Sequence, residues 1–471
     1  MSTTEPAASG AQTIGARLDR LPWSRAHTAI LLALGAGWLF DSFEVQVFSS
    51  AVGPLGDSFR ASVFARDAVL AVWLGGILLG ALVGGRLTDR FGRRRLFVLT
   101  LLWYSAFTVL TGLAPSLGWV YALRFLAALG VGAEYAIVNA AIAEFMPARV
   151  RGRANAVVMN FWPAGAVLAA LMAYLLINET ALSTGMSWRA MFVVGGLLAL
   201  VVLFFRRRIP ESPRWLASQG RTAEAEAVVA RLERASGQPV AAGMAGEPAA
   251  PRLGAALREL VREHPRRLAL GASLDLAEAF GYYGLFALLS VVVLPQVSIS
   301  QGQIPFFYII GNVGAVAGGL VMSAHLDRLG RRRTVVLCYA AAAVGVGLLA
   351  AATATGSAAW VTAAFVLANA AGTAAWTSAY PTFTELFPTH LRGAGVGFSV
   401  AVGRIGAIVG TLLLPSLAAA LGATVSYLLV VVFWLAGAVA MAAYARSGGP
   451  EAARRPLESL APARATAPTA A

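Results

Sequence analysis

The sequence predicts an all-α membrane protein whose twelve transmembrane helices form two pseudo-symmetric six-helix bundles. Three observations lead to this fold class. The composition is 58% hydrophobic and only 13% charged, with a mean hydropathy of +0.70. Twelve apolar runs are long enough to cross a bilayer, which takes about 20 residues. Motifs of the first six runs recur in the last six, at offsets of about 240 residues.

The composition excludes several functional classes. Soluble proteins are about half apolar and a quarter charged, and this chain departs from both values. All 37 basic residues are arginines and the net charge is +14, but their positions explain this charge without nucleic acid. The single cysteine, Cys338, cannot form a disulfide within the chain, and the four histidines lack metal-ligand spacing. No phosphate-binding GxxxxGK[ST] loop follows run two. We therefore expect no metal, cofactor or nucleotide.

The apolar runs set the domain organisation. The first begins near His27 and is too long for a cleavable signal peptide, so it is predicted to remain as a helix. The runs cover residues 27–52, 67–88, 96–114, 117–146, 154–178, 188–206, 267–295, 304–326, 334–353, 358–387, 394–421 and 424–445. They divide the chain into an N-terminal tail (1–26), a first bundle (27–208), a linker (209–266), a second bundle (267–445) and a C-terminal tail (446–471).

The arginines predict the orientation. Of the 37, 32 lie in the tails, the linker and the loops of one side, and three lie in loops of the opposite side. Because arginine-rich loops stay inside the cell, we expect cytoplasmic termini in a protein of the cell (inner) membrane. In the linker, residues 221–236 and 253–264 predict two amphipathic helices joined by a flexible connector. Both tails, rich in Ala, Pro, Ser and Thr, are expected to be disordered.

Two motifs occur once in each half. "GRLTDRFGRRR" (85–95) follows run two and "SAHLDRLGRRR" (323–333) follows run eight, at an offset of 238. "AEFMPARVRG" (143–152) and "TELFPTHLRG" (384–393) follow runs four and ten, at an offset of 241. Such a repeat indicates two homologous halves, a plan that transporters use to rock two bundles around a central site.

These motifs resemble those of the major facilitator superfamily. The doubled DRxGRRR pattern is similar to its loop signature, and residues 124–152 resemble its helix-four pattern. The resemblance covers about residues 25–446 and implies the major facilitator fold. It also implies a set of conformational latch residues at the cytoplasmic helix ends. These are Asp89, Arg93, Glu144 and Arg151 in the first half, and Asp327, Arg331, Glu385 and Arg392 in the second.

The branch within the superfamily follows from smaller features. "IPESPRWL" (209–216) is similar to the sugar-porter and organic-ion branches. The acidic residue after "GWLF" in run one, with the patterns of runs seven, ten and eleven, resembles the niacin-transporter-like and aromatic-acid:proton symporter branches. The paired glutamines of hexose porters in helix seven, their PETKG-like ending and the Gly-Pro-rich motif of drug exporters are missing. Sugar uptake and drug efflux are therefore less favoured.

Run one carries two carboxylates within the membrane. A charge at mid-membrane costs about 2.5–3.5 kcal/mol on insertion scales, so such residues are functional by default. Asp41 lies about 21 Å along the helix, past the middle of a core of roughly 30 Å, and Glu44 shares its face. By resemblance, Asp41 and Arg124 match a proton-sensitive pair. The alternatives are a permanent structural pair and, for Glu44, a place near the outer surface.

Four further charged residues lie in runs four, seven and eleven. Glu134 is a candidate proton relay or a buried structural acid. Glu278 is a candidate substrate-binding residue, whereas Asp275 lies near the cytoplasmic end, where solvation is the simpler interpretation. Arg404 has no acid one turn away in its own helix. A buried arginine needs a partner, so we expect either a substrate carboxylate or an acid such as Glu278 across the cavity.

Uncharged polar and aromatic residues complete the candidate site. An aromatic cavity could be lined by Trp73, Trp162, Tyr282, Tyr283 and Trp376, and Asn160 could bind the substrate by hydrogen bonds. Helix packing and interhelical hydrogen bonds are the alternatives.

Together these features predict a proton-coupled uptake carrier for a small organic anion, with an aromatic or heteroaromatic carboxylate favoured. Protonation of Asp41 would loosen its hold on Arg124, an anion would bind near Arg404, and the two halves would then close. The expected partners are protons, the substrate and the lipid bilayer, with the protein functional as a monomer. The alternatives are an exporter or a sugar or other metabolite porter of the same fold, and a substrate-sensing transceptor. No catalytic triad is found in the runs, so no enzyme is expected.

Overall fold

The computed structural model describes residues 13–176, 182–206, 209–241, 251, 253–300 and 303–460. Within these ranges the chain is helical, and twelve helical segments are long and apolar enough to cross a membrane, which confirms the prediction. They are α2 (Arg25–Ser58), α3 (Val63–Phe91), α4 (Arg93–Gly112), α5 (Leu117–Phe145), α6 (Arg151–Met159) with α7 (Phe161–Tyr174), α8 (Thr184–Arg206), α12 (Pro265–Leu288), α14 (Ile304–Leu329), α15 (Arg331–Ala354), α16 (Ala358–Leu386), α17 (Arg392–Leu421) and α18 (Ala423–Arg446).

The repeated DRxGRRR motif forms the same sharp junction in each half. Gly92 separates α3 from α4 with a φ of 86°, and Gly330 separates α14 from α15 with a φ of 85°. Glycine adopts this left-handed conformation because it has no Cβ. The arginines that follow, beginning at Arg93 and Arg331, therefore form the first turn of a new helix instead of a loop.

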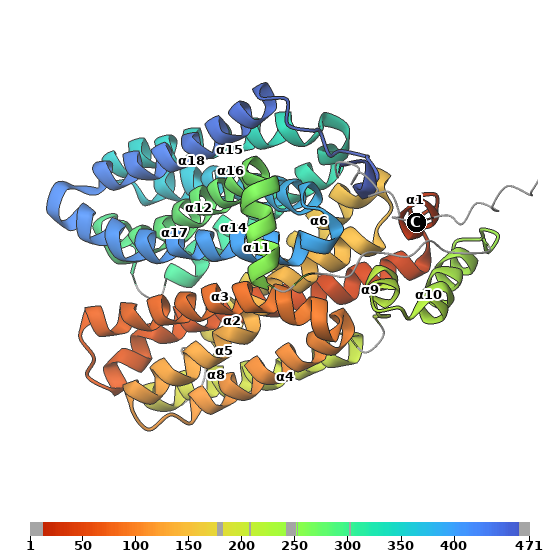
Figure 1. Cartoon of the computed structure of the whole chain (residues 1–471). Helices are drawn as coiled ribbons and strands as arrows, with labels where there is room; N and C mark the ends of the chain where they lie inside the picture. The colour runs from red at the N-terminus through yellow and green to blue at the C-terminus, as the bar shows by residue number, and fades with distance from the viewer. Residues whose placement is uncertain are drawn as a thin grey trace, which may run out of the picture.

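The twelve helices form the two predicted bundles. In the first, α3 packs along α5, α2 along α7 and α4 along α8; in the second, α12 packs along α17, α14 along α16 and α15 along α18. Figure 1 shows the first bundle in red to yellow and the second in green to blue. The bundles meet where α3 packs on α17 and where α6 and α7 pack on α14.

Glycines allow close packing both within and between the bundles. A Cβ on Gly85 of α3 would collide with the backbone oxygen of Gly393 in α17, so this residue sets the distance between the bundles. The row Gly76, Gly80 and Gly84 instead faces the backbone of α5, so it packs helices within the first bundle.

Smaller elements gather at one end of the bundles, which we call the linker side. They are α1 (Ile14–Asp19), α9 (Pro213–Ser218), α10 (Thr222–Ala235), α11 (Leu253–Glu263) and residues 447–460. Figure 1 shows α1, α9 and α10 together at the right-hand end of the molecule. The two predicted linker helices are confirmed as α10 and α11, and Val229 and Leu232 form part of the buried face of α10. Residues 242–250 of the expected connector lie outside the described part of the chain.

The prediction of disordered tails is wrong for residues 13–26 and 447–460. Both segments bury apolar side chains, among them Leu18 and Leu460. Arg17 of α1 also donates to Glu233 of α10, with Nη2 2.7 Å from Oε2. Burial raises the pKa of Glu233, but hydrogen bonds from Arg17 and Arg20 outweigh it and hold the pKa below its ordinary value. Residues 1–12 and 461–471 lie outside the described part of the chain.

Candidate functional site

The two carboxylates of α2 have different surroundings. Glu44 accepts hydrogen bonds from Arg124 of α5 at 2.8 Å and from Thr108 of α4 at 2.5 Å. Neither oxygen of Asp41 has a hydrogen-bond partner among the described residues. The expected pair of Asp41 with Arg124 is therefore wrong, because Arg124 pairs with Glu44. The reason is depth: α5 begins on the side opposite the linker, and Arg124 lies only two turns into it. It therefore meets the carboxylate that lies about 4.5 Å further along α2.

Aromatic rings hold the Arg124 guanidinium in place. Its Cζ lies 5.5 Å from the ring centroid of Phe48, 5.6 Å from that of Trp73 and 5.3 Å from that of Phe192. A cation among aromatic faces in a dry interior is stabilised by their quadrupoles. Arg124 and Glu44 therefore form a buried ion pair, and of the two carboxyl groups of α2 Asp41 is the one without a bonded arginine among the described residues.

Glu134 of α5 also forms an ion pair. Arg206, the last residue of α8, donates to Glu134 Oε2 at 2.9 Å and to the backbone oxygen of Phe97 at 2.8 Å. Gly37 of α2 provides the space, because a Cβ there would collide with both partners. In the sequence, Arg206 counts among the 32 arginines assigned to the linker side of the membrane. Its position at the end of the sixth apolar run was the available signal that it is buried.

Arg404 is the central cation of the second bundle. It donates to the hydroxyl oxygens of Tyr283 at 3.0 Å and Tyr380 at 3.5 Å, and its Nη2 lies 3.7 Å from Oδ2 of Asp275. Its Cζ also lies 5.2 Å from the ring centroid of Tyr135, which belongs to the first bundle. The acid on Arg404 is thus Asp275 and not Glu278. The solvated position expected for Asp275 is wrong, because its side chain is fully buried.

Glu278 has a neutral neighbour instead. Its Oε2 lies 3.3 Å from the hydroxyl of Tyr339, and its Oε1 has no hydrogen-bond partner among the described residues. The Tyr339 hydroxyl lies closer, at 3.0 Å, to the backbone oxygen of Leu274. Glu278 therefore lies in the wall of the second bundle, between α12 and α15.

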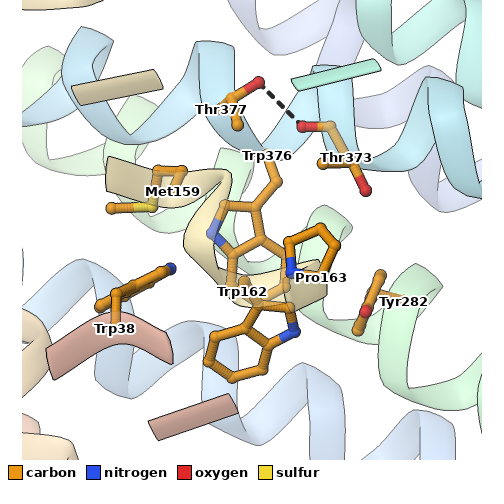
Figure 2. A pocket seen from close by; sticks show the side chains of 8 residues that line it. All are labelled: Trp38, Met159, Trp162, Pro163, Tyr282, Thr373, Trp376 and Thr377. Atoms are coloured by element: carbon orange, nitrogen blue, oxygen red, sulfur yellow. Dashed lines mark hydrogen bonds between the residues drawn. The ribbon is translucent and has the colours of Figure 1, made fainter. Parts of the chain in front are cut away.

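A small pocket lies between the bundles, and aromatic rings dominate its walls (Figure 2). Its lining residues are Trp38, Met159, Trp162, Pro163, Tyr282, Thr373, Trp376 and Thr377. The indole rings of Trp162 and Trp376, one from each bundle, have centroids 5.7 Å apart. The pocket is thus walled by rings from both halves of the protein.

The structure brings only some of the predicted substrate residues to this pocket. Tyr282 and Trp376 line it. Tyr283 and Arg404 lie directly behind, since Tyr283 contacts Trp376 with ring centroids 6.4 Å apart and binds Arg404. Glu278 and Asn160 are not among the lining residues. Asn160 instead lies between the bundles, with its Nδ2 3.4 Å from the backbone oxygen of Val316 in α14.

Sequence reasoning missed five lining residues, which lie on helices of both halves. They are Trp38, Met159, Pro163, Thr373 and Thr377. Trp38 lies one turn before Asp41 on α2, so its spacing from that carboxylate was an available signal. The other four carry no charge, and nothing in their sequence context separates them from ordinary helix packing.

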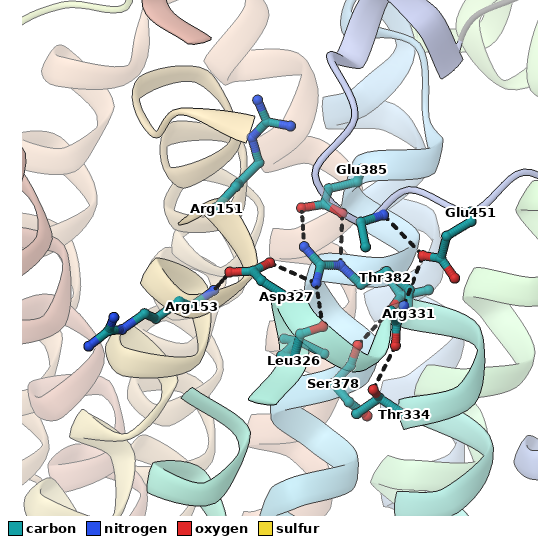
Figure 3. A network of polar contacts seen from close by, with 12 residues as sticks. Arg151, Arg153, Leu326, Asp327, Arg331, Thr334, Ser378, Thr382, Glu385 and Glu451 are labelled. Carbon is teal, nitrogen blue, oxygen red and sulfur yellow. Dashed lines mark hydrogen bonds and ion pairs between the residues drawn. The ribbon is translucent and has the colours of Figure 1, made fainter. Parts of the chain in front are cut away.

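The predicted latch residues form one equivalent ion pair in each half. Arg93 donates to Glu144 at 2.8 Å, and Arg331 donates to Glu385 through two bonds of 3.0 Å. Figure 3 shows Arg331 at the centre of the second network. In the first half, Asp19 of the N-terminal tail lies 3.3 Å from Arg151.

The remaining latch candidates have different surroundings. Arg392 donates to the backbone oxygens of Thr384 and Phe387. The side chain of Asp89 lies outside the described part of the structure.

Asp327 connects the two bundles at the linker side. It forms an ion pair with Arg331 of its own bundle at 2.9 Å and accepts a hydrogen bond from the backbone N–H of Arg153 in α6 at 2.7 Å (Figure 3). A Cβ on Gly152 would collide with Asp327 and Arg331, so glycine allows this approach. Together with the contact of Gly85 and Gly393, these bonds hold the bundles together at the linker side.

A second symmetric pair was missed. Glu211 accepts a hydrogen bond from the backbone N–H of Arg93 at 2.7 Å, and Glu451 accepts one from that of Arg331 at 2.8 Å, so each caps the first turn of a helix. Both follow a proline, at an offset of 240. That repeat was the available signal.

The two capping carboxylates differ in their acidity. Burial raises the pKa of Glu211 above its ordinary value, although backbone N–H groups and Arg93 oppose the shift. Burial acts on Glu451 in the same direction, but hydrogen bonds from three backbone N–H groups and the charge of Arg331 outweigh it and hold the pKa below its ordinary value. Glu451 is therefore the better stabilised carboxylate of the two.

Known proteins match this arrangement over nearly the whole chain. Residues 42–463 match a family model described as "Sugar (and other) transporter". The chain is 31% identical to the niacin transporter NiaP of Acinetobacter baylyi, over 83% of this chain and 87% of that protein. It is 30% identical to the "Probable 4-methylmuconolactone transporter" of Cupriavidus pinatubonensis, over 80% of this chain and 81% of that protein.

A solved structure shares the fold. The proton:xylose symporter XylE of E. coli, bound to 6-bromo-6-deoxy-D-glucose, superimposes with a TM-score of 0.76 at 19% identity, covering 92% of this chain and 98% of that one. These matches identify a multi-pass membrane transporter of small molecules and not an enzyme. The chain belongs to the sugar (and other) transporter family of the major facilitator superfamily.

Proposed function

We propose that this transporter takes up a small aromatic or heteroaromatic carboxylate together with protons. One observation carries the proposal: the fully buried guanidinium of Arg404 lies directly behind an aromatic pocket between the bundles. Tyr283 and Tyr380 bind Arg404, and both contact Trp376, which lines the pocket. A flat ring stacks on the faces of indoles, and a carboxylate matches the planar fork of a guanidinium. The likeness to a niacin transporter supports this substrate class.

Asp41 is the proposed proton carrier. The three other buried carboxylates of the described first bundle are each bonded to an arginine: Glu44 to Arg124, Glu134 to Arg206 and Glu144 to Arg93. An isolated carboxylate in the membrane interior is costly and is neutralised more readily than it is left charged. Asp41 therefore binds a proton when it is enclosed, and releases it when movement of the bundles exposes it to water.

The cytoplasm is the proposed location of the linker side and both termini. The support is the excess of arginine in the loops of this side. With this orientation, the bonds of Asp327 close the pocket toward the cytoplasm. In the transport cycle these bonds break, and the bundles rock about the pocket to open the inner side. The protein functions as a monomer in the cell (inner) membrane.

Uptake into proteoliposomes tests the proposal. We would impose an alkaline interior and measure accumulation of radiolabelled nicotinate and benzoate, with D-xylose as the comparison. Accumulation of the two carboxylates that a protonophore abolishes is expected. Accumulation of xylose alone would instead make the chain a sugar porter, and accumulation of the carboxylates only under the reverse gradient would make it an exporter. Binding of the carboxylates without transport under either gradient would indicate a transceptor.

A further inference from the structure

Asp275 forms the loosest of the ion pairs that lie between the helices of the bundles. Its Oδ2 lies 3.7 Å from Nη2 of Arg404, whereas the pair of Glu44 with Arg124 measures 2.8 Å and that of Glu385 with Arg331 measures 3.0 Å. The shorter bonds of Arg404 go to neutral hydroxyl groups. A carboxylate that makes a bidentate pair with Arg404 would therefore compete well with Asp275.

Among the described residues, no other cation interacts with Asp275 once Arg404 is lost to the substrate. The charged or titratable groups that interact with Asp275 there are Glu278 of its own helix, Tyr339 of α15, Tyr380 of α16 and Arg404 of α17. Arg404 is the only positive group in this set. Asp275 is fully buried, and Gly403 provides its space, since a Cβ there would overlap Oδ2. Loss of Arg404 to a substrate leaves a buried, uncompensated carboxylate, which is neutralised by a proton.

Glu278 does not fit this role because no arginine forms an ion pair with it among the described residues. The hydroxyl of Tyr339 donates to Oε2 of Glu278 at 3.3 Å and lies 3.0 Å from the backbone oxygen of Leu274, so the bonded neighbour of Glu278 is a neutral group. A substrate carboxylate that binds Arg404 therefore displaces Asp275 and not Glu278.

We propose that Asp275 is a second proton-coupling residue, which the substrate carboxylate displaces from Arg404 and which binds a proton on displacement. The inference rests on the proposed function, because it requires an anionic substrate. One proton then travels on Asp41 and one on Asp275 with each monoanion. Transport moves one net positive charge, whereas a carrier with Asp41 alone would be electroneutral.

Membrane potential separates the two stoichiometries. In proteoliposomes with equal pH on both sides, a potassium gradient with valinomycin sets a negative interior. For one net charge, 100 mV supports an accumulation of nicotinate of about fortyfold. We expect this accumulation for the parent protein. The Asp275→Asn variant should show none, yet it should still accumulate nicotinate when a pH gradient drives the Asp41 proton.

A binding measurement keeps the test independent of transport. Nicotinate binding in detergent is followed through tryptophan fluorescence, since three tryptophans line the pocket. The affinity of the parent for nicotinate should fall as pH rises. In Asp275→Asn the fall in affinity per pH unit should be smaller, by up to a factor of ten. Equal pH dependence in both proteins would overturn the role of Asp275. So would a parent protein that responds to a pH gradient and ignores membrane potential. If neither gradient drives accumulation in the parent, the proposed function itself is refuted.

Discussion

Two neighbouring carboxylates of α2 provide a matched pair of substitutions. Glu44 accepts hydrogen bonds from Arg124 at 2.8 Å and from Thr108 at 2.5 Å. Glu44→Gln removes the charge that balances a fully buried arginine, and breaking such a pair costs about 3–5 kcal/mol. At roughly 2 °C for each kcal/mol in a large domain, we expect the melting temperature to fall by about 6–10 °C. Asp41→Asn breaks no hydrogen bond of the described structure, so its melting temperature should stay close to that of the parent.

Asp41→Asn, the variant that should keep the stability of the parent, is the one that should lose concentrative transport. Asp41→Asn imitates the protonated carboxyl group. It should still bind nicotinate and exchange it across the membrane in counterflow, but it should fail to concentrate it under a pH gradient. Thermal unfolding is read from intrinsic fluorescence in detergent, and accumulation and counterflow from proteoliposomes. If Glu44→Gln is as stable as the parent, or if Asp41→Asn concentrates nicotinate, the division into a structural and a proton-carrying carboxylate is refuted.

Three further predictions address the substrate cation, the closed linker side and the helix cap. Arg404→Gln, made with Asp275→Asn to keep the interior neutral, should weaken nicotinate binding at least tenfold, because a hydrogen bond to a charged group contributes about 1.5–3 kcal/mol; calorimetric titration showing unchanged affinity would contradict this. Asp327→Asn should speed labelling of a cysteine at Thr377 by a thiol reagent added on the linker side, because the bond to Arg153 is weakened; an unchanged rate would mean that other contacts hold this side closed. Glu451→Gln should lower the melting temperature at neutral pH, and the difference should shrink as pH falls. The depressed pKa of Glu451 provides stability above the unfolded value of about 4.3 that is lost as pH falls through the folded value. A difference that persists at low pH would contradict this.

The amino-acid sequence alone determined the membrane class, the number of spans and the two-bundle plan. Lipid offers no hydrogen bonds to the backbone, so each span must be a helix that is apolar along about 20 residues, and such a segment is visible without knowledge of its neighbours. The repeated DRxGRRR motif can also be recognised without knowledge of its neighbours in the fold. Gly92 and Gly330 form the same junction wherever the rest of the chain lies.

The sequence also located the buried charges, because a charged residue within an apolar run is costly wherever it occurs. It could not decide their partners. Arg124 pairs with Glu44 and not with Asp41 because α5 runs opposite to α2, and the depth of a residue depends on where its helix begins. In the sequence Arg206 stands directly before the polar linker, whereas in the structure α8 brings it to Glu134.

Tertiary structure alone decided the composition of the pocket. Trp38 and Trp376 are distant in sequence and carry no charge, so neither marks the other as a neighbour, yet both line one space between the bundles. The same holds for Asp275 and Arg404, whose pairing depends on the space left by Gly403. The cost of a buried group is a property of its own segment and can be read from the sequence. Its partner depends on the register between helices, which only packing of the two bundles sets.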